Sequence, residues 1–294
     1  MADSGNSYIV HRTSYIVHHF LSLPKQHLMK DKVTIITGAS SGIGRALARE
    51  AYARGARVVL AARRKEALEH ISKEWNSSSY LNVEADVTSE NDCRKLIDET
   101  IRKFGRIDIL INNAGISMRA LFEEVDLDVI RKLMDTNFWG TVYCSNYALP
   151  HLLKTKGSLV GVSSVAGYKG LPGRAGYSAS KFAMHGLLEV IRIENIKKGL
   201  HVLIACPGFT SSNIRNIALS KDGSSQGETP LDESKLMPAE TVAKLICNAI
   251  EKRKHTLVLT TMGKLTVLLN KFFPKFMDGM VYNHMAKEAD SPFK

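Results

Sequence analysis

The octapeptide TGASSGIG at residues 37–44 determines the fold, because it joins a short apolar run to an amphipathic stretch. The apolar run Val33–Ile36 precedes it, and Ile43–Ala53 follows with helical spacing of its apolar residues. A glycine by itself often marks no more than a strand end. Here a strand precedes the glycines and a helix follows them. The backbone can then approach a bound phosphate closely, and the unpaired N–H groups at the helix N-terminus can donate to it. This order predicts a pyrophosphate-binding turn in a parallel sheet.

Short apolar runs and amphipathic stretches continue to alternate downstream of this turn. Near-continuous apolar runs are typical of strands that are buried on both faces. We predict an α/β fold: a single Rossmann-like, doubly wound parallel sheet of about seven strands, with helices on both faces. The predicted strands are Val33–Ile36, Val58–Ala61, Tyr80–Val83, Ile107–Ile111, Ser158–Val162, His201–Ala205 and Leu257–Leu259, and the predicted helices are Ile43–Ala53, Lys65–Trp75, Ser89–Phe104, Leu127–Leu153, Tyr177–Lys198 and Ala239–Arg253.

No linker divides the chain, so we expect one catalytic domain over residues 31–262 with a segment at each end. Residues 1–30 contain a repeated SYIVH and lack the features of a secretory signal, which predicts a disordered extension and makes Met29 a candidate initiator. The glycine- and serine-containing connection at residues 207–237 is expected to form a lid. Residues 263–294 are expected to be an amphipathic tail of the same domain.

Composition excludes several classes of protein. Hydrophobic residues make up 44% of the 294 residues and no apolar run approaches the length of a membrane-spanning helix, so neither a wholly disordered nor a membrane-spanning chain is expected. The four cysteines are widely spaced, which predicts reduced thiols in a cytoplasmic protein and no metal site. The net charge of +11 is spread along the chain without a basic run interleaved with aromatic residues. We therefore expect an anionic ligand rather than nucleic acid.

The end of the second predicted strand favours one nicotinamide cofactor. Ala62 stands there, followed by Arg63 and Arg64. An acidic side chain at this point would bind the ribose 2′-hydroxyl of NAD, whereas an arginine pairs with the 2′-phosphate of NADP. We expect NADP(H) to be favoured over NAD(H), with the Ser40 hydroxyl as a further phosphate contact. In the alternative interpretation the two arginines simply face solvent.

A tyrosine and a lysine with helical spacing carry the predicted chemistry. Tyr177 and Lys181 lie at positions i and i+4, so they share one face of the predicted helix. A neighbouring ammonium stabilises phenolate, so we expect the pKa of Tyr177 to be depressed, which prepares a general acid/base. Ser164 follows the preceding strand, where its hydroxyl can polarise a carbonyl oxygen held by Tyr177. Such a helical pair alone is common, but this combination is not.

Together these motifs resemble the short-chain dehydrogenase/reductase family over residues from about 32 to 260. The turn matches TGxxxGxG, residues 112–115 read NNAG, and the serine stands 13 residues before the tyrosine of YxxxK. The resemblance implies that Asn137, Ser164, Tyr177 and Lys181 are catalytic. It implies that the cofactor-binding residues are Gly38, Ser40, Ser41, Gly42, Ile43, Gly44, Arg63, Arg64, Asp86, Val87, Asn113, Ala114, Gly115, Tyr177, Lys181, Pro207, Gly208 and Thr210.

The resemblance also implies a role for each catalytic residue. Tyr177 exchanges a proton with the substrate oxygen, Ser164 stabilises that oxygen, and Asn137 positions a water that relays protons. Lys181 holds the nicotinamide ribose and lowers the pKa of Tyr177. A hydride then passes between NADP(H) and a carbonyl or secondary alcohol, without a metal. The family's threonine after the proline–glycine turn is replaced by Ser212, so the hydroxyl that contacts the cofactor could be that of Thr210 or Ser212.

Finer features are similar to the branch of hydroxysteroid dehydrogenases and related lipid reductases, which implies a steroid- or lipid-like substrate. These features are the arginines after the second strand, residues 212–215 and the long tail. The substrate pocket is expected from Ser117–Glu123, Tyr168–Arg174 and the lid. A catalytically silent, NADP-sensing protein of the same fold is the alternative, and the complete catalytic set argues against it.

The tail has apolar residues at near-helical spacing with lysines between them, and Pro274 should kink or break its helix. The favoured interpretation is packing against the protein's own core or a sister subunit. The alternative is a substrate-entrance flap that touches a membrane surface. The resemblance implies a homodimer or homotetramer through the helices at 127–153 and 177–198. The apolar tail residues are Leu265, Leu268, Leu269, Phe272, Phe273, Phe276 and Met280, and the lysines are Lys264, Lys271 and Lys275.

Overall fold

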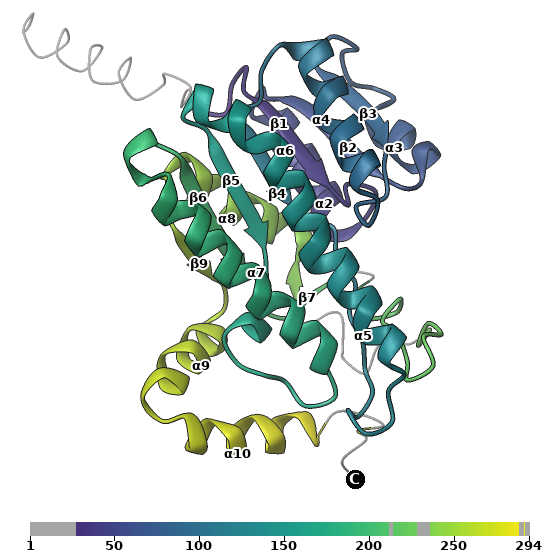
Figure 1. Cartoon of the computed structure of the whole chain (residues 1–294), viewed down its shortest axis with the longest axis vertical. Coiled ribbons are helices and arrows are strands. Elements are labelled where there is room, and N and C mark those ends of the chain that lie inside the picture. The colour runs from purple at the N-terminus through teal and green to yellow at the C-terminus, as the bar shows by residue number, and fades with distance from the viewer. Residues whose placement is uncertain (1–27, 212–213, 228–235, 288–290, 292–294) are drawn as a thin grey trace, which may run out of the picture.

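Seven short apolar segments pair in parallel and form one sheet in the order β3-β2-β1-β4-β5-β6-β9 (Figure 1). The computed structural model describes residues 28–211, 214–227, 236–287 and 291. Strand order reverses between β1 and β4, which makes this the switch point of a doubly wound sheet. The predicted fold class is therefore confirmed. The strands are β1 (Val33–Thr37), β2 (Arg57–Ala62), β3 (Tyr80–Glu84), β4 (Ile109–Asn112), β5 (Ser158–Val162), β6 (His201–Cys206) and β9 (Thr256–Val258).

Helices cover both faces of the sheet, as the alternation of strand and helix segments requires. The buried residues of α2, α3 and α8 join one hydrophobic cluster, and those of α4, α6 and α7 join a second cluster on the opposite face. The helices are α2 (Gly42–Ala53), α3 (Lys65–Ser72), α4 (Glu90–Phe104), α5 (Leu127–Leu133), α6 (Gly140–Thr155), α7 (Ala175–Glu194), α8 (Ala239–Glu251), α9 (Thr261–Phe272) and α10 (Pro274–Met285), with short 3₁₀ turns η2 (Val165–Gly167) and η3 (Ile196–Lys198).

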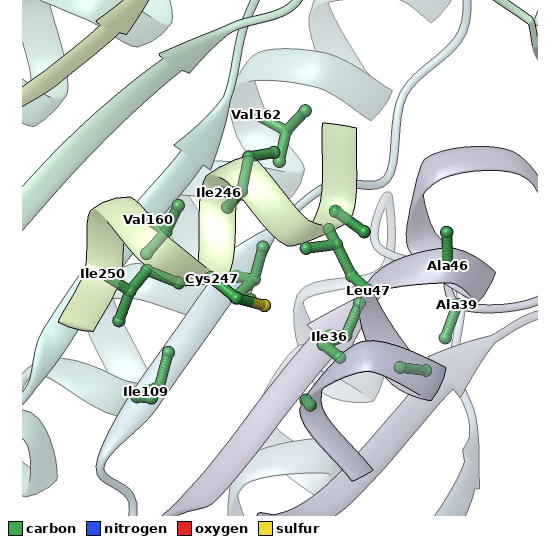
Figure 2. Packing of buried hydrophobic residues seen from close by; sticks show 14 of the residues in the cluster. Ile36, Ala39, Ala46, Leu47, Ile109, Val160, Val162, Ile246, Cys247 and Ile250 are labelled. Atoms are coloured by element: carbon green, nitrogen blue, oxygen red, sulfur yellow. The ribbon is translucent and has the colours of Figure 1, made fainter. Parts of the chain in front are cut away.

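The core sits on the two faces of the central strands. Successive strand residues point to opposite faces, so Ile35 joins the cluster under α4, α6 and α7, while Ile36 joins the cluster under α2 and α8. Figure 2 shows Leu47 of α2 beside Ile36, and Ile250 of α8 over the strand residue Val160. Each such fully buried aliphatic side chain contributes about 1.5–3 kcal/mol of transfer free energy. This packing holds the carboxyl ends of the strands in place, where the site forms.

The structure differs from the sequence prediction at several element boundaries and in one additional pair of strands. The helix predicted over 127–153 is interrupted by a π-helix, η1 (Met134–Trp139). The helix predicted to reach Trp75 ends at Ser72, and the indole instead stacks on Tyr52 at a centroid distance of 4.2 Å. A short parallel pair, β7 (Thr210–Ser211) with β8 (Met237–Pro238), was not predicted, because two-residue strands leave no periodic signal.

The two ends of the chain differ in how they join the domain. Residues 1–27 of the predicted extension lie outside the described residues, while Met29 is buried in the core cluster beside α2. Pro274 starts α10 two residues after α9 ends, which confirms the predicted break. Figure 1 shows α10 lying across the lower end of the molecule, away from the sheet. No helix in the described part of the chain is long and apolar enough to cross a bilayer.

Candidate active site

The turn between β1 and α2 is pressed against the segment that follows β4. Gly38 has φ +65°, and a Cβ atom there would lie 2.8 Å from the Cα of Ala114. A Cβ at Gly44 would lie 2.1 Å from the carbonyl oxygen of Gly38, a distance that no side chain tolerates. The Ser41 side chain does not cap α2, so it does not occupy the N–H groups of the first helical turn, which remain available to a ligand. These residues fit a dinucleotide pyrophosphate, which would bind at this helix N-terminus.

Thr37 joins this turn to the NNAG segment. Its Oγ1 accepts hydrogen bonds from the backbone N–H groups of Asn113 and Ala114, each at 3.0 Å. The Asn113 Nδ2 in turn donates to the Thr37 carbonyl oxygen at 2.9 Å. The predicted residues Gly38, Asn113 and Ala114 therefore form one rigid unit. Sequence reasoning did not assign Thr37 this role, although its place at the head of the motif was a usable signal.

The residues predicted to bind the adenosine half lie after β2 and β3 at the same edge of the sheet. Arg63 and Arg64 are exposed immediately after β2. The Asp86 carboxylate accepts hydrogen bonds from the backbone N–H of Thr88 at 3.0 Å and from its hydroxyl at 2.9 Å. Val87 is buried beside this turn. The structure thus brings the two arginines and Asp86 to the open end of neighbouring strands, where a nucleotide base and ribose can reach them.

Tyr177 and Lys181 both lie on α7, and Ser164 faces them from the segment after β5. The Ser164 side chain interacts with the Tyr177 hydroxyl and favours its ionised form. Ser164 also caps η2, because its Oγ accepts a hydrogen bond from the backbone N–H of Ala166 at 3.2 Å. Lys181 is buried, and its Nζ donates to the carbonyl oxygen of Val162 at 3.0 Å. The structure therefore brings together three of the four predicted catalytic residues.

The protonation states at this centre differ from the sequence prediction. Burial raises the pKa of Tyr177 above its ordinary value, and the hydrogen bond with Ser164 opposes that shift only in part. Burial lowers the pKa of Lys181 to about 8. The Lys181 Nζ lies 5.8 Å from the centroid of the Tyr177 ring, facing the Val162 carbonyl. The expected depression of the Tyr177 pKa is therefore wrong, because desolvation of the phenol outweighs the lowering effects of Ser164 and Arg174.

Asn137 lies in the π-helix, which places its side chain beside the segment after NNAG. Its Oδ1 accepts from the backbone N–H of Ile116 at 2.9 Å, and its Nδ2 donates to the Ile116 carbonyl at 3.0 Å and to Ser180 Oγ at 2.9 Å. A Cβ at Gly115 would lie 3.1 Å from Asn137 Oδ1 and 3.6 Å from Lys181 Nζ. Asn137 thus locks this backbone close to Lys181. Ser180, which sequence reasoning missed, stands inside the YxxxK motif itself.

The proline–glycine turn follows β6 and leads into β7. Thr210 is buried, and its Oγ1 donates to the carbonyl oxygen of Gly208 at 3.1 Å. Gly208 packs closely on Thr260, because a Cβ would lie 2.9 Å from the threonine side chain. The turn that begins at Pro207 therefore lies at the same edge of the sheet as the other predicted residues. The alternative hydroxyl, that of Ser212, lies outside the described residues.

The three segments predicted to form the substrate pocket lie side by side. Leu219 of the lid donates its backbone N–H to Ser117 at 2.9 Å and accepts from Arg119 at 2.9 Å. Ala120 in turn donates its backbone N–H to Gly173 at 3.0 Å. Residues 228–235 of the lid lie outside the described residues. The described part of the lid therefore pairs with the 117–123 segment, which pairs with the 168–174 segment next to Tyr177.

Comparisons with known proteins agree with this geometry. A family model described as short chain dehydrogenase matches residues 32–222. A protein named 11-beta-hydroxysteroid dehydrogenase A, from Arachis hypogaea, is 38% identical over 260 residues, which cover 84% of this chain and 73% of that protein. A protein named 11-beta-hydroxysteroid dehydrogenase 1A, from Arabidopsis thaliana, is 36% identical over the same length and coverage.

Solved structures share the fold. A short-chain dehydrogenase from Streptomyces avermitilis has a TM-score of 0.74 and 29% identity, with 86% of this chain and 97% of that chain covered. A short chain dehydrogenase/reductase from Burkholderia phymatum, solved in complex with NAD, has a TM-score of 0.74 and 24% identity over 84% of this chain and 95% of that chain. The glycine turn, the YxxxK helix and these likenesses agree, and the chain belongs to the short-chain dehydrogenase family of NAD(P)-binding oxidoreductases.

Proposed function

We propose that the protein transfers a hydride between NADP(H) and a carbonyl or secondary alcohol of a lipophilic, steroid- or lipid-like substrate. The observation that carries this proposal is the grouping of Ser164 with Tyr177 and the buried Lys181: the Ser164 side chain interacts with the Tyr177 phenol, and Lys181 donates to the carbonyl of Val162 at the end of β5. The names of the similar hydroxysteroid dehydrogenases support the substrate class. Screening NADPH oxidation over steroid, quinone, aliphatic and sugar carbonyls, with NADH in parallel, tests it; turnover limited to hydrophilic sugars would contradict the substrate class.

In the reduction direction, Tyr177 donates its hydroxyl proton to the substrate oxygen as negative charge develops there, and Ser164 donates a hydrogen bond to the same atom. The raised pKa keeps Tyr177 protonated near neutral pH, which suits this acid role. The Lys181 ammonium stabilises the phenolate that remains, and Asn137 positions a water for the proton's return. Bound NADPH would supply the hydride.

We propose that Arg63 and Arg64 give the preference for NADP over NAD. Both are exposed after β2, where a 2′-phosphate of the adenosine ribose would lie. An Arg63→Ala/Arg64→Ala variant should lose at least tenfold in kcat/KM with NADPH, because charge-assisted hydrogen bonds are lost, and little with NADH. Arg57 is exposed at the opposite end of β2, so Arg57→Ala is the matched control. Equal losses with both cofactors would contradict the assignment.

The NADP-sensing alternative makes a different prediction for Tyr177. If the protein is an enzyme, Tyr177→Phe abolishes turnover and leaves NADPH binding within about twofold, because the lost hydroxyl belongs to the proton-transfer step. If it is a sensor, neither the wild type nor the variant turns over any carbonyl in the panel. NADPH affinity, measured by fluorescence, together with turnover separates the two functions.

We propose a homodimer or homotetramer that forms through α6 and α7, as the resemblance implies. Large apolar side chains are exposed on α7 and on η1, which leads directly into α6, with Ile193 at 64%, Val190 at 52% and Trp139 at 43%. A second copy would remove this surface from water. Light scattering should therefore give a multiple of 32.5 kDa, and Ile193→Glu should lower it. A wild-type monomer at micromolar concentration would contradict this arrangement.

We further propose that the tail touches a lipid surface. Leu268, Phe272 and Phe276 are 56%, 62% and 61% exposed and can meet a surface, while Met277 and Met285 of the same tail are buried in the protein. Lys271 and Lys275 stand beside them, which matches an anionic membrane. The wild-type protein should co-sediment with anionic liposomes, and a Phe272→Ser/Phe276→Ser variant should not. Equal sedimentation of both proteins would favour the sister-subunit interpretation instead.

A further inference from the structure

A buried serine–histidine pair lies beneath the reaction centre. Ser163 Oγ and His185 Nε2 are 2.7 Å apart, and both residues are buried. His185 follows Lys181 by one turn of α7, and Ser163 directly precedes Ser164 after β5. The proposed reaction as described above assigns this pair no part, although the pair joins the two elements that carry the reacting side chains.

The imidazole fills the space between three segments of the site. Cys206, the last residue of β6, has its Sγ 3.7 Å from His185 Nε2. Gly167 of η2 approaches so closely that a Cβ there would lie 2.6 Å from the same nitrogen. The Tyr168 ring packs edge-on at a centroid distance of 4.6 Å. His185 therefore packs against η2, the turn that Ser164 caps, and against the end of β6.

The backbone of residues 162–164 connects Ser163 to the groups that bind Lys181 and to Ser164. The backbone N–H of Ser163 donates to the Ala205 carbonyl of β6 at 2.7 Å, which holds the Ser163 main chain in the sheet. The preceding carbonyl, that of Val162, accepts the hydrogen bond from Lys181 Nζ. The Ser163–His185 hydrogen bond adds a side-chain contact to this backbone contact, and it lies between the Val162 carbonyl that accepts from Lys181 and the neighbouring Ser164.

The bond joins neutral groups. Burial, with a smaller contribution from the Lys181 charge, lowers the pKa of His185 to about 4. The other titratable groups that face the imidazole are the Cys206 thiol, whose pKa burial raises to about 12, and the Tyr168 phenol, whose pKa burial also raises. Among Lys181, His185, Cys206 and Tyr168, Lys181 is therefore the residue that is charged at neutral pH. His185 bonds Ser163 as a neutral imidazole and adds no second positive charge beside Lys181.

We propose that His185 is a positioning residue for the reaction: through Ser163 it fixes the Ser164 hydroxyl and the Val162 carbonyl that holds Lys181. This inference rests on the proposed oxidoreductase function. Removing the bond should therefore lower the rate of the chemical step and leave the fold and the cofactor site in place, because misplacement of reacting groups acts on kcat.

The chain provides a matched control at the opposite end of the same strand. Ser158, the first residue of β5, has its Oγ 2.9 Å from His201 Nδ1, and both residues are buried. Burial also lowers the pKa of His201 to about 4. This second serine–histidine pair has the same chemistry and lies at the amino end of β5, whereas the reaction centre lies at the carboxyl end. A purely structural role predicts equal effects at both ends.

The experiment compares His185→Leu, Ser163→Ala, His185→Gln and His201→Leu in the full chain. With a carbonyl substrate from the screen, kcat should fall about 10- to 100-fold in His185→Leu and Ser163→Ala, while KM and the NADPH Kd stay within about twofold. Glutamine offers an amide near the position of Nε2, so His185→Gln should recover most of kcat. His201→Leu should lower Tm and leave kcat within about twofold.

A second readout needs no substrate. NADPH affinity measured by fluorescence should weaken as Lys181 loses its proton near pH 8, and a Lys181→Ala variant identifies that step. The hydrogen bond to the Val162 carbonyl favours the charged form of Lys181, so weakening it should lower the Lys181 pKa. The pH at which NADPH affinity falls should therefore decrease by roughly half a pH unit in Ser163→Ala, and should not change in His201→Leu. If no carbonyl substrate is reduced, the proposed function fails, and this shift in the pH dependence of NADPH binding alone tests whether His185 positions Lys181.

Three results would overturn the inference. The first is an unchanged kcat in both folded variants, and the second is an equal loss of kcat in His201→Leu. The third is a Ser163→Ala variant in which NADPH affinity weakens at the same pH as in the wild type. If His185→Leu does not fold, Ser163→Ala, which removes one oxygen atom, keeps the test decisive.

Discussion

Acid should destabilise this protein through His201, whose protonation state is determined by its two hydrogen bonds. Its Nε2 lies 2.9 Å from the Lys254 carbonyl, which can only accept, so Nε2 carries the proton. Nδ1 then accepts from the Ser158 hydroxyl at 2.9 Å. Burial, assisted by the Arg253 charge, lowers the pKa of His201 from 6.5 to about 4. The folded protein therefore resists a proton that the unfolded chain takes up readily.

The size of this effect follows from the two pKa values. Because the folded pKa is below the unfolded one, the unfolded state binds more protons between pH 6.5 and 4, and stability falls as the pH is lowered through that window. The full difference is about 3 kcal/mol, of which about 2 kcal/mol is lost between pH 7 and pH 4.5. Replacing His201 by glutamine removes this titration and keeps an amide able to hydrogen-bond.

Urea unfolding followed by circular dichroism at pH 7.0, 5.5 and 4.5 measures this difference. His201→Gln should start less stable at pH 7, since hydrogen bonds and packing are lost, and should then lose about 2 kcal/mol less than the wild type on going to pH 4.5. His185 titrates in both proteins, so its contribution cancels. Parallel pH profiles for the two proteins would refute the assignment of this acid sensitivity to His201.

Two further substitutions test other parts of the structure. Gly44→Ala should weaken NADPH binding at least tenfold in a fluorescence titration, because the new Cβ would lie 2.1 Å from the Gly38 carbonyl oxygen; Gly279→Ala, with nothing within 4 Å, should bind NADPH normally. Arg54 is buried and donates to Glu251 at 2.9 Å, joining α2 to α8, so Arg54→Met should lower the free energy of unfolding by about 3 kcal/mol in urea, and a change below about 1 kcal/mol would contradict this.

Local sequence was sufficient for the seven strands of the main sheet and for the helices whose apolar residues recur regularly. Ser158–Val162 was predicted with its observed bounds, because five consecutive buried residues leave an unbroken run. The helix over 127–153 was predicted without its π-helix, which contains Asn137 and its contact with Ile116, because helical periodicity encodes neither the change of hydrogen-bond pattern nor this contact. The two-residue strands β7 and β8 were missed because their pairing is long-range.

The candidate site was predictable as far as its residues belong to short motifs. Tyr177 and Lys181 share a helix face by spacing alone, and Gly38 stands in a turn that its own sequence marks. The sign of the Tyr177 pKa shift was not predictable, because spacing shows a neighbouring lysine but not the burial that outweighs it. The Ser163–His185 bond was also missed, since the two residues are 22 positions apart and neither belongs to a motif.

The sequence by itself determined the parallel α/β fold and the glycine turn at its switch point, and it was enough to single out Tyr177, Lys181 and Ser164 for the roles proposed above. Apolar runs, glycine spacing and helical spacing are local properties, and local properties can be read along one chain. The tertiary structure alone decided the direction of the Tyr177 pKa shift, the contact of Asn137 with Ile116 and the contact of His185 with Ser163. Each of these depends on desolvation or on contacts between distant segments, which exist only after the sheet and its helices have packed.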